Sequence, residues 1–235
     1  MSSWAPKRFW QNATVAEAPG GFRVLLDGRE VRTPSKTPLI VPTQAMAEAI
    51  AAEWQAQDTK VRPETMPFTR SANSALDKVT PQFTDVADII AAYGASDLLC
   101  YRAGHPKELV ARQAAAWDPL LDWAAAKLDA PLTVTTGIVP VEQPAASVAA
   151  LSARVHALTP FQLAGFHDLV AISGSLVLGF AISLKEIDVT EGWALSRVDE
   201  TWQVEQWGED EEATASEAVR KDGMMHAARF FALCG

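Results

Sequence analysis

The chain has 235 residues, 49% of them hydrophobic and 21% charged, so it is long enough to bury a core in one large domain or two modest ones. Its 29 acidic and 20 basic residues give a formal net charge of -9, which argues against nucleic acid or anionic membranes as partners because phosphate recognition depends on clustered Lys and Arg. Lys7 with Arg8, and Arg29 with Arg32, are too small as groups to supply such a cluster.

Short strands are expected near the start of the chain. Residues 22–26 place Phe, Val and Leu on one face of an extended segment, and Asp27 and Gly28 then supply a hairpin-type turn. Residues 30–32 form a natural return strand, and residues 39–41 fit one more short strand between prolines that break the chain into extended pieces.

A helix is expected after these strands. Thr43 is placed to cap its N-terminus, because a threonine hydroxyl can accept a hydrogen bond from a free backbone N–H of the first turn. Met46, Ile50 and Trp54 recur every four residues and so share one face of this helix. Strands and helix together predict a small α+β unit.

Two domains are expected: an α+β domain of short antiparallel strands and a helix at residues 1–67, and a larger, mainly α-helical bundle domain at residues 68–235. The boundary follows a proline-rich connection, beyond which the sequence becomes alanine-rich. Residues 132–141 are rich in β-branched side chains and are expected to be extended and to return to pair with the first domain. Helices are predicted at residues 81–93, 106–128, 147–158, 160–184, 190–207 and 213–233.

The uncharged run at residues 169–184 is shorter than the roughly 20 residues that a membrane-spanning helix needs. A buried helix is therefore expected there. Its small residues Gly174, Ser175 and Gly179 would let neighbouring helices approach closely at the centre of the second domain.

The helix predicted at residues 190–207 has two faces of different character. Leu195, Val198 and Trp202 form an apolar stripe, so Trp202 is predicted to be a core residue. The other side chains combine acids, an arginine, an amide and a large aromatic ring, a mixture typical of protein interfaces. An amphipathic helix with solvated charges has the same spacing, and spacing alone leaves both interpretations open. The residues concerned are Ser196, Arg197, Asp199, Glu200, Gln203 and Trp207.

No pattern favours a metal or a cofactor. The four histidines never occur at the i, i+4 spacing of a helical metal pair, and the chain has no phosphate-binding loop or dinucleotide-binding turn. The chain has two cysteines, Cys100 and Cys234, which rules out a disulfide framework and suits a reducing compartment. Cys100 is expected to be a small buried thiol, because no histidine is placed by sequence to act as its base.

Two alternatives to partner binding by the predicted helix stay open. A small cytosolic hydrolase or transferase using Asp199, Glu200 and His167 would need these groups to converge in one cleft. His167 and its neighbour Asp168 are expected to point to different faces of a helix, which favours a structural histidine. A plain scaffold would instead bind through the acidic run at residues 209–212.

Several strings, in one order along nearly the whole chain, resemble the ATP-twelve-type chaperones. Such a resemblance implies a chaperone, not an enzyme, that assists assembly of the catalytic head of ATP synthase. It implies binding of the free α subunit, shielding of the surface destined for the β subunit, and release as the ring forms. The matching strings are KRFW at 7–10, GFRVLLDGR at 21–29, TP at 33–34, AEW at 52–54, MP at 66–67, NSALD at 73–77, DLLCYR at 97–102, ELV at 108–110, WDPL at 117–120, LSRVDE at 195–200, Gln203, and WG at 207–208.

The resemblance also implies a site. An acidic position of the C-terminal helix motif is important in the family, and the matching positions here are Asp199 and Glu200. Glu200 is favoured because it shares a helix face with Gln203 and Trp207. Where relatives commonly carry a further acid, this chain has Thr201, so a lower charge density is expected. The complete set of expected partner-binding residues is Glu200, Asp199, Arg197, Ser196, Gln203 and Trp207.

The N-terminal residues Met1 to Trp4 resemble neither a secretory apolar core nor an acid-poor transit segment of the kind that mitochondrial relatives carry. We therefore expect a bacterial-type, cytoplasmic, monomeric protein whose partner is the α subunit of the catalytic head, with no cofactor, no nucleic acid and no membrane insertion.

Overall fold

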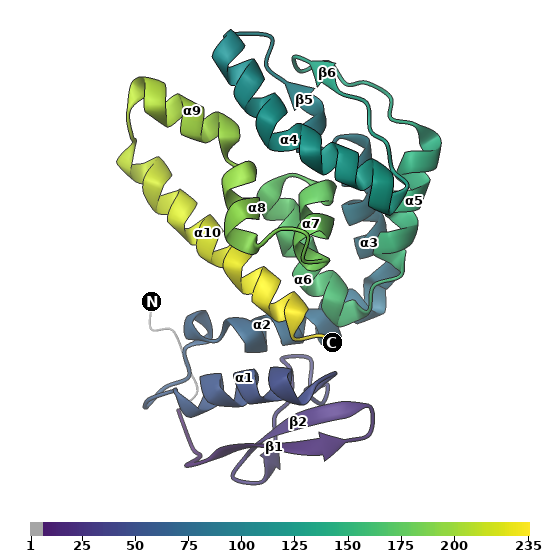
Figure 1. The fold of residues 1–235 in the computed structure, drawn as a ribbon. Coiled ribbons are helices and arrows are strands. Elements are labelled where there is room, and N and C mark those ends of the chain that lie inside the picture. The colour runs from purple at the N-terminus through teal and green to yellow at the C-terminus, as the bar shows by residue number, and fades with distance from the viewer. Residues whose placement is uncertain (1–6) are drawn as a thin grey trace. The chain divides into compact units, whose positions relative to one another are not determined.

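The computed structural model of the protein describes residues 7–235 and divides the chain into two compact units (Figure 1). Unit 1 comprises the chain up to Phe83 with residues 159–165 and 229–235, and unit 2 comprises residues 84–158 and 166–228. The N-terminal stretch on which the expectation about targeting depends lies outside the described residues.

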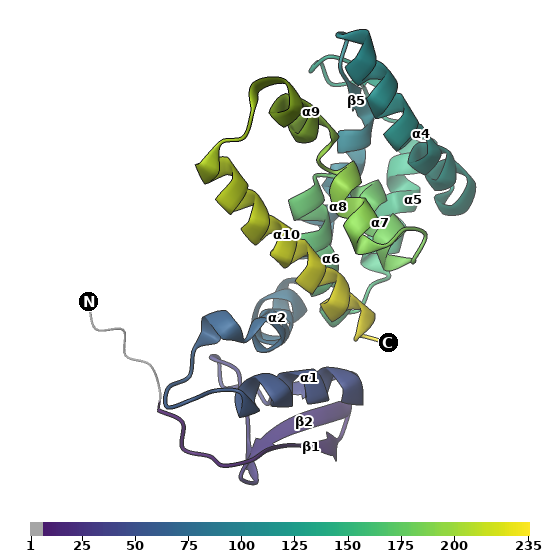
Figure 2. The same cartoon turned by 60° about the vertical axis from the view of Figure 1, so that its left-hand side comes forward.

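Unit 1 contains a four-stranded antiparallel sheet with helix α1 across it, as Figures 1 and 2 both show. The strand order is β1-β2-β3, and β4 pairs with β2. Asp27 and Gly28 join β2 to β3 with φ values of 46° and 81°, the left-handed conformation that a tight hairpin turn requires, so this turn is confirmed. The elements are β1 (Ala13–Ala18), β2 (Gly21–Leu26), β3 (Arg29–Glu30), β4 (Ile40–Val41), α1 (Gln44–Gln55) and α2 (Pro67–Ser74).

Helix α1 begins as the sequence predicts. The Thr43 hydroxyl accepts a hydrogen bond from the Met46 backbone N–H at 3.2 Å and caps the helix. Met46 and Ile50 are fully buried in the core of unit 1, and the ring of Trp54 meets that of Trp10 edge-on at 5.2 Å. The predicted apolar face of α1 therefore holds the helix on the sheet.

The core of unit 1 extends beyond the expected domain boundary at residue 67. Ala72 on α2 is fully buried in the same core as Met46, and Phe68 packs against it. From the far end of the chain, Phe230 is also fully buried in this core. Composition changes near residue 67, but packing in space decides which segments share a core, and the structure therefore divides the chain elsewhere.

Unit 2 is mainly helical, with α6, α7 and α8 near its centre in both ribbon views (Figures 1 and 2). In the described part of the chain, no helix is long and apolar enough to cross a membrane. The remaining elements are α3 (Phe83–Ala91), β5 (Tyr101–Arg102), α4 (Lys107–Leu128), β6 (Thr135–Thr136), α5 (Ala145–His156), α6 (Pro160–Ser173), α7 (Leu176–Ser183), α8 (Val189–Leu195), α9 (Val198–Trp207) and α10 (Glu211–Ala232).

The single helix expected at residues 160–184 is two helices. Gly174 adopts a φ of +76°, which ends α6, and the Ser175 hydroxyl then caps α7 by accepting from the Leu178 N–H at 3.0 Å. The predicted close approach is confirmed at Gly179, where an added Cβ would lie 2.7 Å from Val170 Cγ2. Small residues here both interrupt the helix and let α7 lie against α6.

The extended segment expected at residues 132–141 does form a strand, but the expectation that it returns to the first domain is wrong. β6 pairs in parallel with β5 inside unit 2. The side-chain amide of Gln143 accepts from the Thr133 N–H at 2.7 Å and donates to the Thr133 carbonyl at 2.9 Å, so the segment is tied to its own neighbourhood. The Gly137 N–H adds a bond of 2.8 Å to the Arg102 carbonyl.

Candidate functional site

The helix expected at residues 190–207 is interrupted at its centre. α8 ends at Leu195 and α9 begins at Val198, with Ser196 and Arg197 forming the turn between them. Ser196 and Arg197 are only 2% and 8% exposed, and the Ser196 hydroxyl donates to the Trp193 carbonyl at 2.8 Å. The expectation that these two side chains lie on an open binding face is therefore wrong, because they hold the turn together.

Glu200 pairs with the buried arginine of this turn. Its carboxylate lies 2.8 Å from the Arg197 guanidinium, which also lies over the Trp193 ring at 5.3 Å. The pKa of Arg197 is lowered by burial, and the nearby Glu200 charge opposes this shift. Glu200 is exposed, but its charge is directed at a residue of its own unit.

A groove of about 650 Å³ opens in unit 2 between α9 and the segment around β5, β6 and the start of α4. From α9 it takes three of the expected partner-binding residues, Asp199, Gln203 and Trp207. Glu200 does not line it. The remaining lining residues are Trp202, Gln206, Tyr101, Arg102, Ala103, His105, Pro106, Leu109, Gln113, Gly137 and Ile138.

Trp202 lines this groove, and the expectation that it lies in the core is wrong. The turn before α9 breaks the continuous stripe on which that expectation depended. The Arg112 guanidinium lies 5.0 Å from the Trp202 ring and pairs with Glu205 at 2.8 Å. The hydrogen bond to Glu205 raises the pKa of Arg112, and the same bond lowers the pKa of Glu205.

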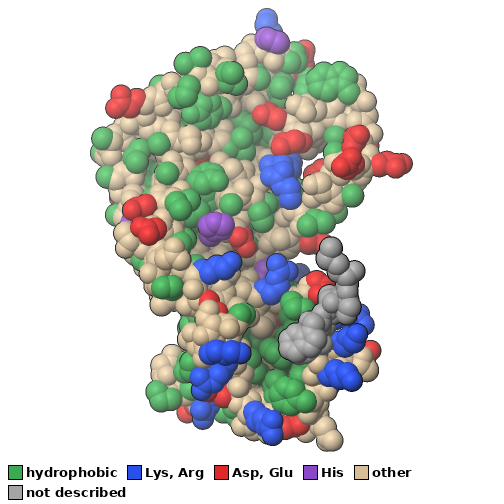
Figure 3. All heavy atoms as spheres, turned by 180° about the vertical axis from the view of Figure 1, so that it is seen from behind, with side chains coloured by type: hydrophobic (Ala, Val, Ile, Leu, Met, Phe, Trp, Pro, Cys, Tyr) green, Lys and Arg blue, Asp and Glu red, His purple; other side chains and the backbone are tan. Residues whose placement is uncertain are grey.

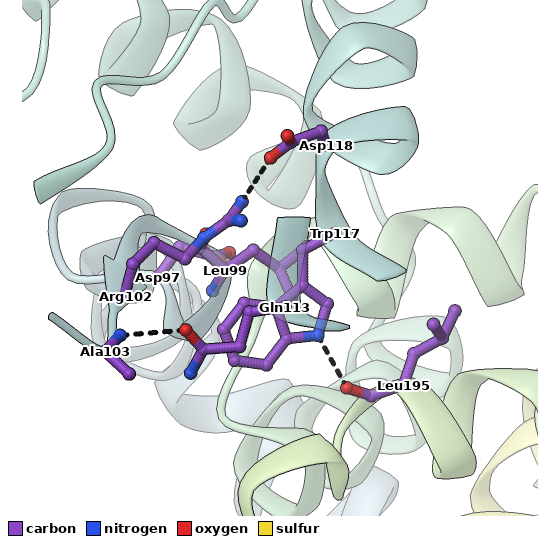
Figure 4. Close-up of polar contacts among 8 residues, drawn as sticks. All are labelled: Asp97, Leu99, Arg102, Ala103, Gln113, Trp117, Asp118 and Leu195. Atoms are coloured by element: carbon purple, nitrogen blue, oxygen red, sulfur yellow. Dashed lines mark hydrogen bonds and ion pairs between the residues drawn. The ribbon is translucent and has the colours of Figure 1, made fainter. Parts of the chain in front are cut away.

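The base of the groove rests on a network of buried polar side chains (Figure 4). Gln113, almost fully buried on α4, accepts a bond from the Ala103 N–H at 2.8 Å and donates to Asp199 Oδ1 at 2.6 Å. One turn further along α4, the Trp117 indole N–H donates to the Leu195 carbonyl at 2.8 Å. These bonds hold α4 against the α8–α9 turn.

Arg102 supports the same region from β5. Its Nε donates to the Leu99 carbonyl at 2.9 Å, its guanidinium pairs with Asp118 at 2.8 Å and it lies 5.1 Å from the centre of the Trp117 ring (Figure 4). Asp97 is fully buried, and burial raises the pKa of its carboxyl although it accepts backbone N–H bonds. The strings at residues 97–102 and 117–120 thus build the support of the groove.

Neither thiol is set up as a nucleophile. Burial raises the pKa of Cys100 to about 12, with the Asp97 charge acting in the same direction and Arg102 against it. Burial also raises the pKa of Cys234 to about 12. Thiols with such pKa values stay protonated near neutral pH and react slowly.

The groups of the enzyme alternative do not meet in the groove. His167 and Asp168 do contact each other, with Nδ1 and Oδ1 2.9 Å apart, so the expectation that they point apart is wrong. Among the three groups of that alternative, Asp199 lines the groove and Glu200 and His167 do not. Among residues 7–235, no group of three His, Cys, Asp or Glu side chains is placed to hold a metal ion.

The second wall of the groove was not singled out from the sequence. It comes from residues 101–109 and from Gly137 and Ile138, which are roughly 60 to 100 residues from α9 along the chain, a separation that helix and strand periodicity cannot bridge. Tyr101 and Arg102 belong to a string that resembles the chaperone family, which was the available signal. Ile138 and its neighbour Val139 follow β6, and exposed apolar residues are common on protein surfaces.

The chain thus combines a small sheet-and-helix unit with a helical unit that has an open groove of mixed polar and apolar lining. The chain belongs to the ATP12 family: the family model described as "ATP12 chaperone protein" matches residues 7–125.

Solved structures agree with this assignment. The crystal structure of Atp12 from Paracoccus denitrificans is 50% identical, with a TM-score of 0.95, over 97% of this chain and 98% of the other. An aspartate-to-lysine mutant of Atp12p from P. denitrificans is 49% identical, with a TM-score of 0.96 over the same shares. Among curated proteins, mitochondrial atp12 of Schizosaccharomyces pombe is 26% identical over 219 residues, covering 88% of this chain and 75% of that protein.

Proposed function

We propose that this protein is an assembly chaperone of the ATP synthase catalytic head, and that it binds the free α subunit through the groove of unit 2. Membership of the ATP12 chaperone family supports the general role. The observation that carries the site is that Trp207, 79% exposed, and the Asp199 carboxylate line the same groove. A large exposed aromatic ring is typical of an interface anchor, and a carboxylate in the same groove can pair with a cation of the partner.

Such a groove suits a reversible interaction. A groove of about 650 Å³ can hold a few side chains of a partner. Permanent assemblies bury much larger, continuous surfaces. A chaperone that shields the surface of α destined for β must bind well enough to keep α soluble and must still give way to β. A small, partly polar contact meets both needs.

Within the proposed site, Asp199, Gln203 and Trp207 contact the partner, and Ser196 and Arg197 position α9 from the buried turn. Glu200 lies outside the groove with its charge directed at Arg197, so Asp199 replaces it as the carboxylate that we propose to be decisive.

The proposal is tested by co-expressing the tagged chain with the α and β subunits of the same host, followed by affinity capture and size-exclusion chromatography. Capture of soluble α without β is the expected result. Trp207→Ala should weaken capture at an unchanged melting temperature, whereas Val219→Ala, at a 73% exposed valine of α10 outside the groove, should not. Capture of β alone, or of neither subunit, would contradict the proposal.

The amide pair Asp199→Asn and Glu200→Gln separates the two candidate carboxylates at constant size. Asp199→Asn keeps an oxygen for Gln113 but removes the charge from the groove, and Glu200→Gln removes the charge that faces Arg197. We expect the first to weaken capture of α and the second to leave it intact. The reverse result would restore Glu200 as the decisive residue.

The acidic run at residues 209–212 is the second candidate site, because it is exposed and follows the end of α9. Replacing its four acids by amides should leave capture of α intact if the groove is the site. We also infer that the protein acts as a monomer in the cytoplasm of a bacterial cell. Light scattering of the purified chain that gave twice the mass of 25.3 kDa would overturn the monomer.

A further inference from the structure

The two walls of the groove differ in what they offer to a ligand. The α9 wall carries a carboxylate, Asp199, and a ring at its end, Trp207. The opposite wall is mainly apolar, with Pro106, Leu109 and Ile138 among its lining residues. Ile138 is 92% exposed, and with Trp207 it is one of the most exposed large apolar side chains among the described residues. Single exposed apolar side chains are ordinary, but two that line one groove indicate a docking surface.

No cation of the described residues 7–235 forms an ion pair with the Asp199 carboxylate. Arg102, the arginine that lines the groove, is 8% exposed and paired with Asp118. Arg112, at the Trp202 ring, is paired with Glu205. Asp199 accepts a hydrogen bond from Gln113 on one oxygen, and the described residues give it no ion pair. Tyr101 and His105 are the other ionisable side chains on the walls.

The surroundings of the groove are acidic as well. Unit 2 contains 21 Asp and Glu against 9 Lys and Arg, whereas unit 1 contains 8 against 11. The run at residues 209–212 follows directly after α9. Figure 3 shows acidic side chains exposed on unit 2, and it shows many Lys and Arg side chains on unit 1. A positively charged ligand group is therefore favoured at the groove over a negative one.

The apolar wall is held in place without a ligand. Gln143 forms two hydrogen bonds with the backbone of Thr133, and the Gly137 N–H is bonded to the Arg102 carbonyl. Ile138 follows directly on this anchored backbone. A wall that is already ordered loses little entropy when a ligand binds, which favours a short ligand segment.

We propose that the groove accepts one short segment of the partner in which a Lys or Arg stands next to a bulky apolar residue. The cation meets Asp199, and the apolar side chain lies between Ile138 and Trp207. This inference rests on the proposed function, since the segment is taken to belong to the α subunit. It adds a recognition rule that combines one charge with one apolar anchor and it assigns a role to Ile138.

The test uses overlapping 15-residue peptides that tile the α and β subunits of the same host, probed with the full-length chain. Peptides that bind should contain Lys or Arg within two residues of Leu, Ile, Met, Phe or Trp. In the strongest binder, replacing that cation by Glu should lower binding at least tenfold. Ile138→Ser in the chaperone should also lower binding at least tenfold, whereas Val219→Ser, at an exposed valine outside the groove, should leave it unchanged.

A charge swap shows whether the cation meets Asp199. Asp199→Lys should abolish binding of the original peptide and restore binding of the peptide in which Glu replaces the cation. Thermal melts of every variant confirm that the fold is retained. The inference would be overturned if folded Asp199→Lys did not bind the peptide in which Glu replaces the cation. It would also be overturned if the peptides that bind the wild type were acidic or uncharged.

Capture of the whole α subunit is measured in parallel, so that the two proposals can fail separately. If α is captured but Ile138→Ser and Asp199→Lys change neither capture nor peptide binding, the recognition rule is wrong and the proposed function stands. The opposite outcome is that neither subunit is captured, while the bound peptides contain the expected cation and apolar residue and both variants change peptide binding as predicted. In that case the proposed function is wrong and the chemistry assigned to the groove stands.

Discussion

The side-chain amide of Gln113 on α4 donates a hydrogen bond of 2.6 Å to the carboxylate of Asp199 on α9. The two residues are 86 positions apart in the sequence. Through its oxygen the same amide accepts from the N–H of Ala103, the residue after β5, so one buried side chain joins the end of β5 to α4 and α9 at the base of the groove. The orientation of the Asp199 carboxylate is therefore set by a residue that does not itself carry charge.

Replacing Gln113 by Leu should destabilise the fold and weaken binding of the α subunit together. The buried amide satisfies a backbone N–H and a carboxylate, and leaving such groups unpaired costs about 1–3 kcal/mol. Urea denaturation measures the loss of stability, and titration of α measures the loss of affinity. Gln44→Leu, at an exposed glutamine whose side-chain amide donates to Glu48 on the same helix, is the control and should change neither. An unchanged affinity in Gln113→Leu would mean that the Asp199 orientation is unimportant for binding.

Two tryptophans should respond to truncation in opposite ways. Trp117 is almost fully buried and donates to the Leu195 carbonyl, so Trp117→Ala should cost about 3–5 kcal/mol of unfolding free energy. Trp207 is exposed, so Trp207→Ala should cost less than about 0.5 kcal/mol while reducing capture of α. Chemical denaturation with matched binding assays checks the contrast. Comparable loss of stability in the two variants would contradict the placement of Trp207 on the surface.

Replacing Gly179 by Ala should destabilise unit 2 although alanine is the better helix former. The new Cβ would lie 2.7 Å from Val170 Cγ2 and 3.2 Å from the Phe166 ring, and a β-branched valine has little freedom to move away. We expect a net loss of about 1–3 kcal/mol, measured by thermal and urea denaturation.

Gly223→Ala is the matched control for this substitution. Its Cβ would meet only the tip of Ile172 at 3.2 Å, in another helix of the same unit, so the gain in helix propensity of up to about 1 kcal/mol should prevail. If both alanine variants behaved alike, the close approach of α6 and α7 would not be what requires glycine at position 179.

Asp27 should contribute a pH-dependent stability to unit 1. Backbone hydrogen bonds from Asn12 and Gln11, both 2.9 Å long, lower the pKa of its carboxyl below the ordinary value of 3.8. A lowered folded-state pKa means that the contribution is present above the unfolded pKa and is lost as the pH falls through the folded one. Unfolding free energies of the wild type and of Asp27→Asn, measured in urea at pH 7 and at pH 3, should differ more at pH 7.

Asparagine is a suitable replacement at this position because it tolerates the left-handed conformation of the turn. The substitution therefore removes the titrating group and keeps the hairpin. A difference between wild type and variant that grew from pH 7 to pH 3 would show that the two backbone bonds do not hold the ionised carboxylate.

The local features of this protein could be read from the sequence alone. The Thr43 cap, the Asp27–Gly28 turn and the buried face of α1 each depend on residues a few positions apart, where propensity and periodicity act directly. The resemblance of strings along the chain identified the family, and Gly179 was correctly expected to allow close packing. The expected site also contained three side chains that line the groove, Asp199, Gln203 and Trp207.

The break of a long helix at Ser196 and Arg197 was decided by tertiary packing. Burial of these two side chains outweighs the helical pattern and ends α8 before α9 begins. The faces of α9 are therefore not continuous with those of α8, and Trp202 lines the groove whereas Glu200 does not. The second wall of the groove and the Gln113 contact join segments that are roughly 60 to 100 residues apart, and periodicity carries no information over such a distance. The amino-acid sequence by itself determined the local elements and the family, and only the folded core decided which side chains meet in the groove, because contacts between distant segments depend on how whole elements pack.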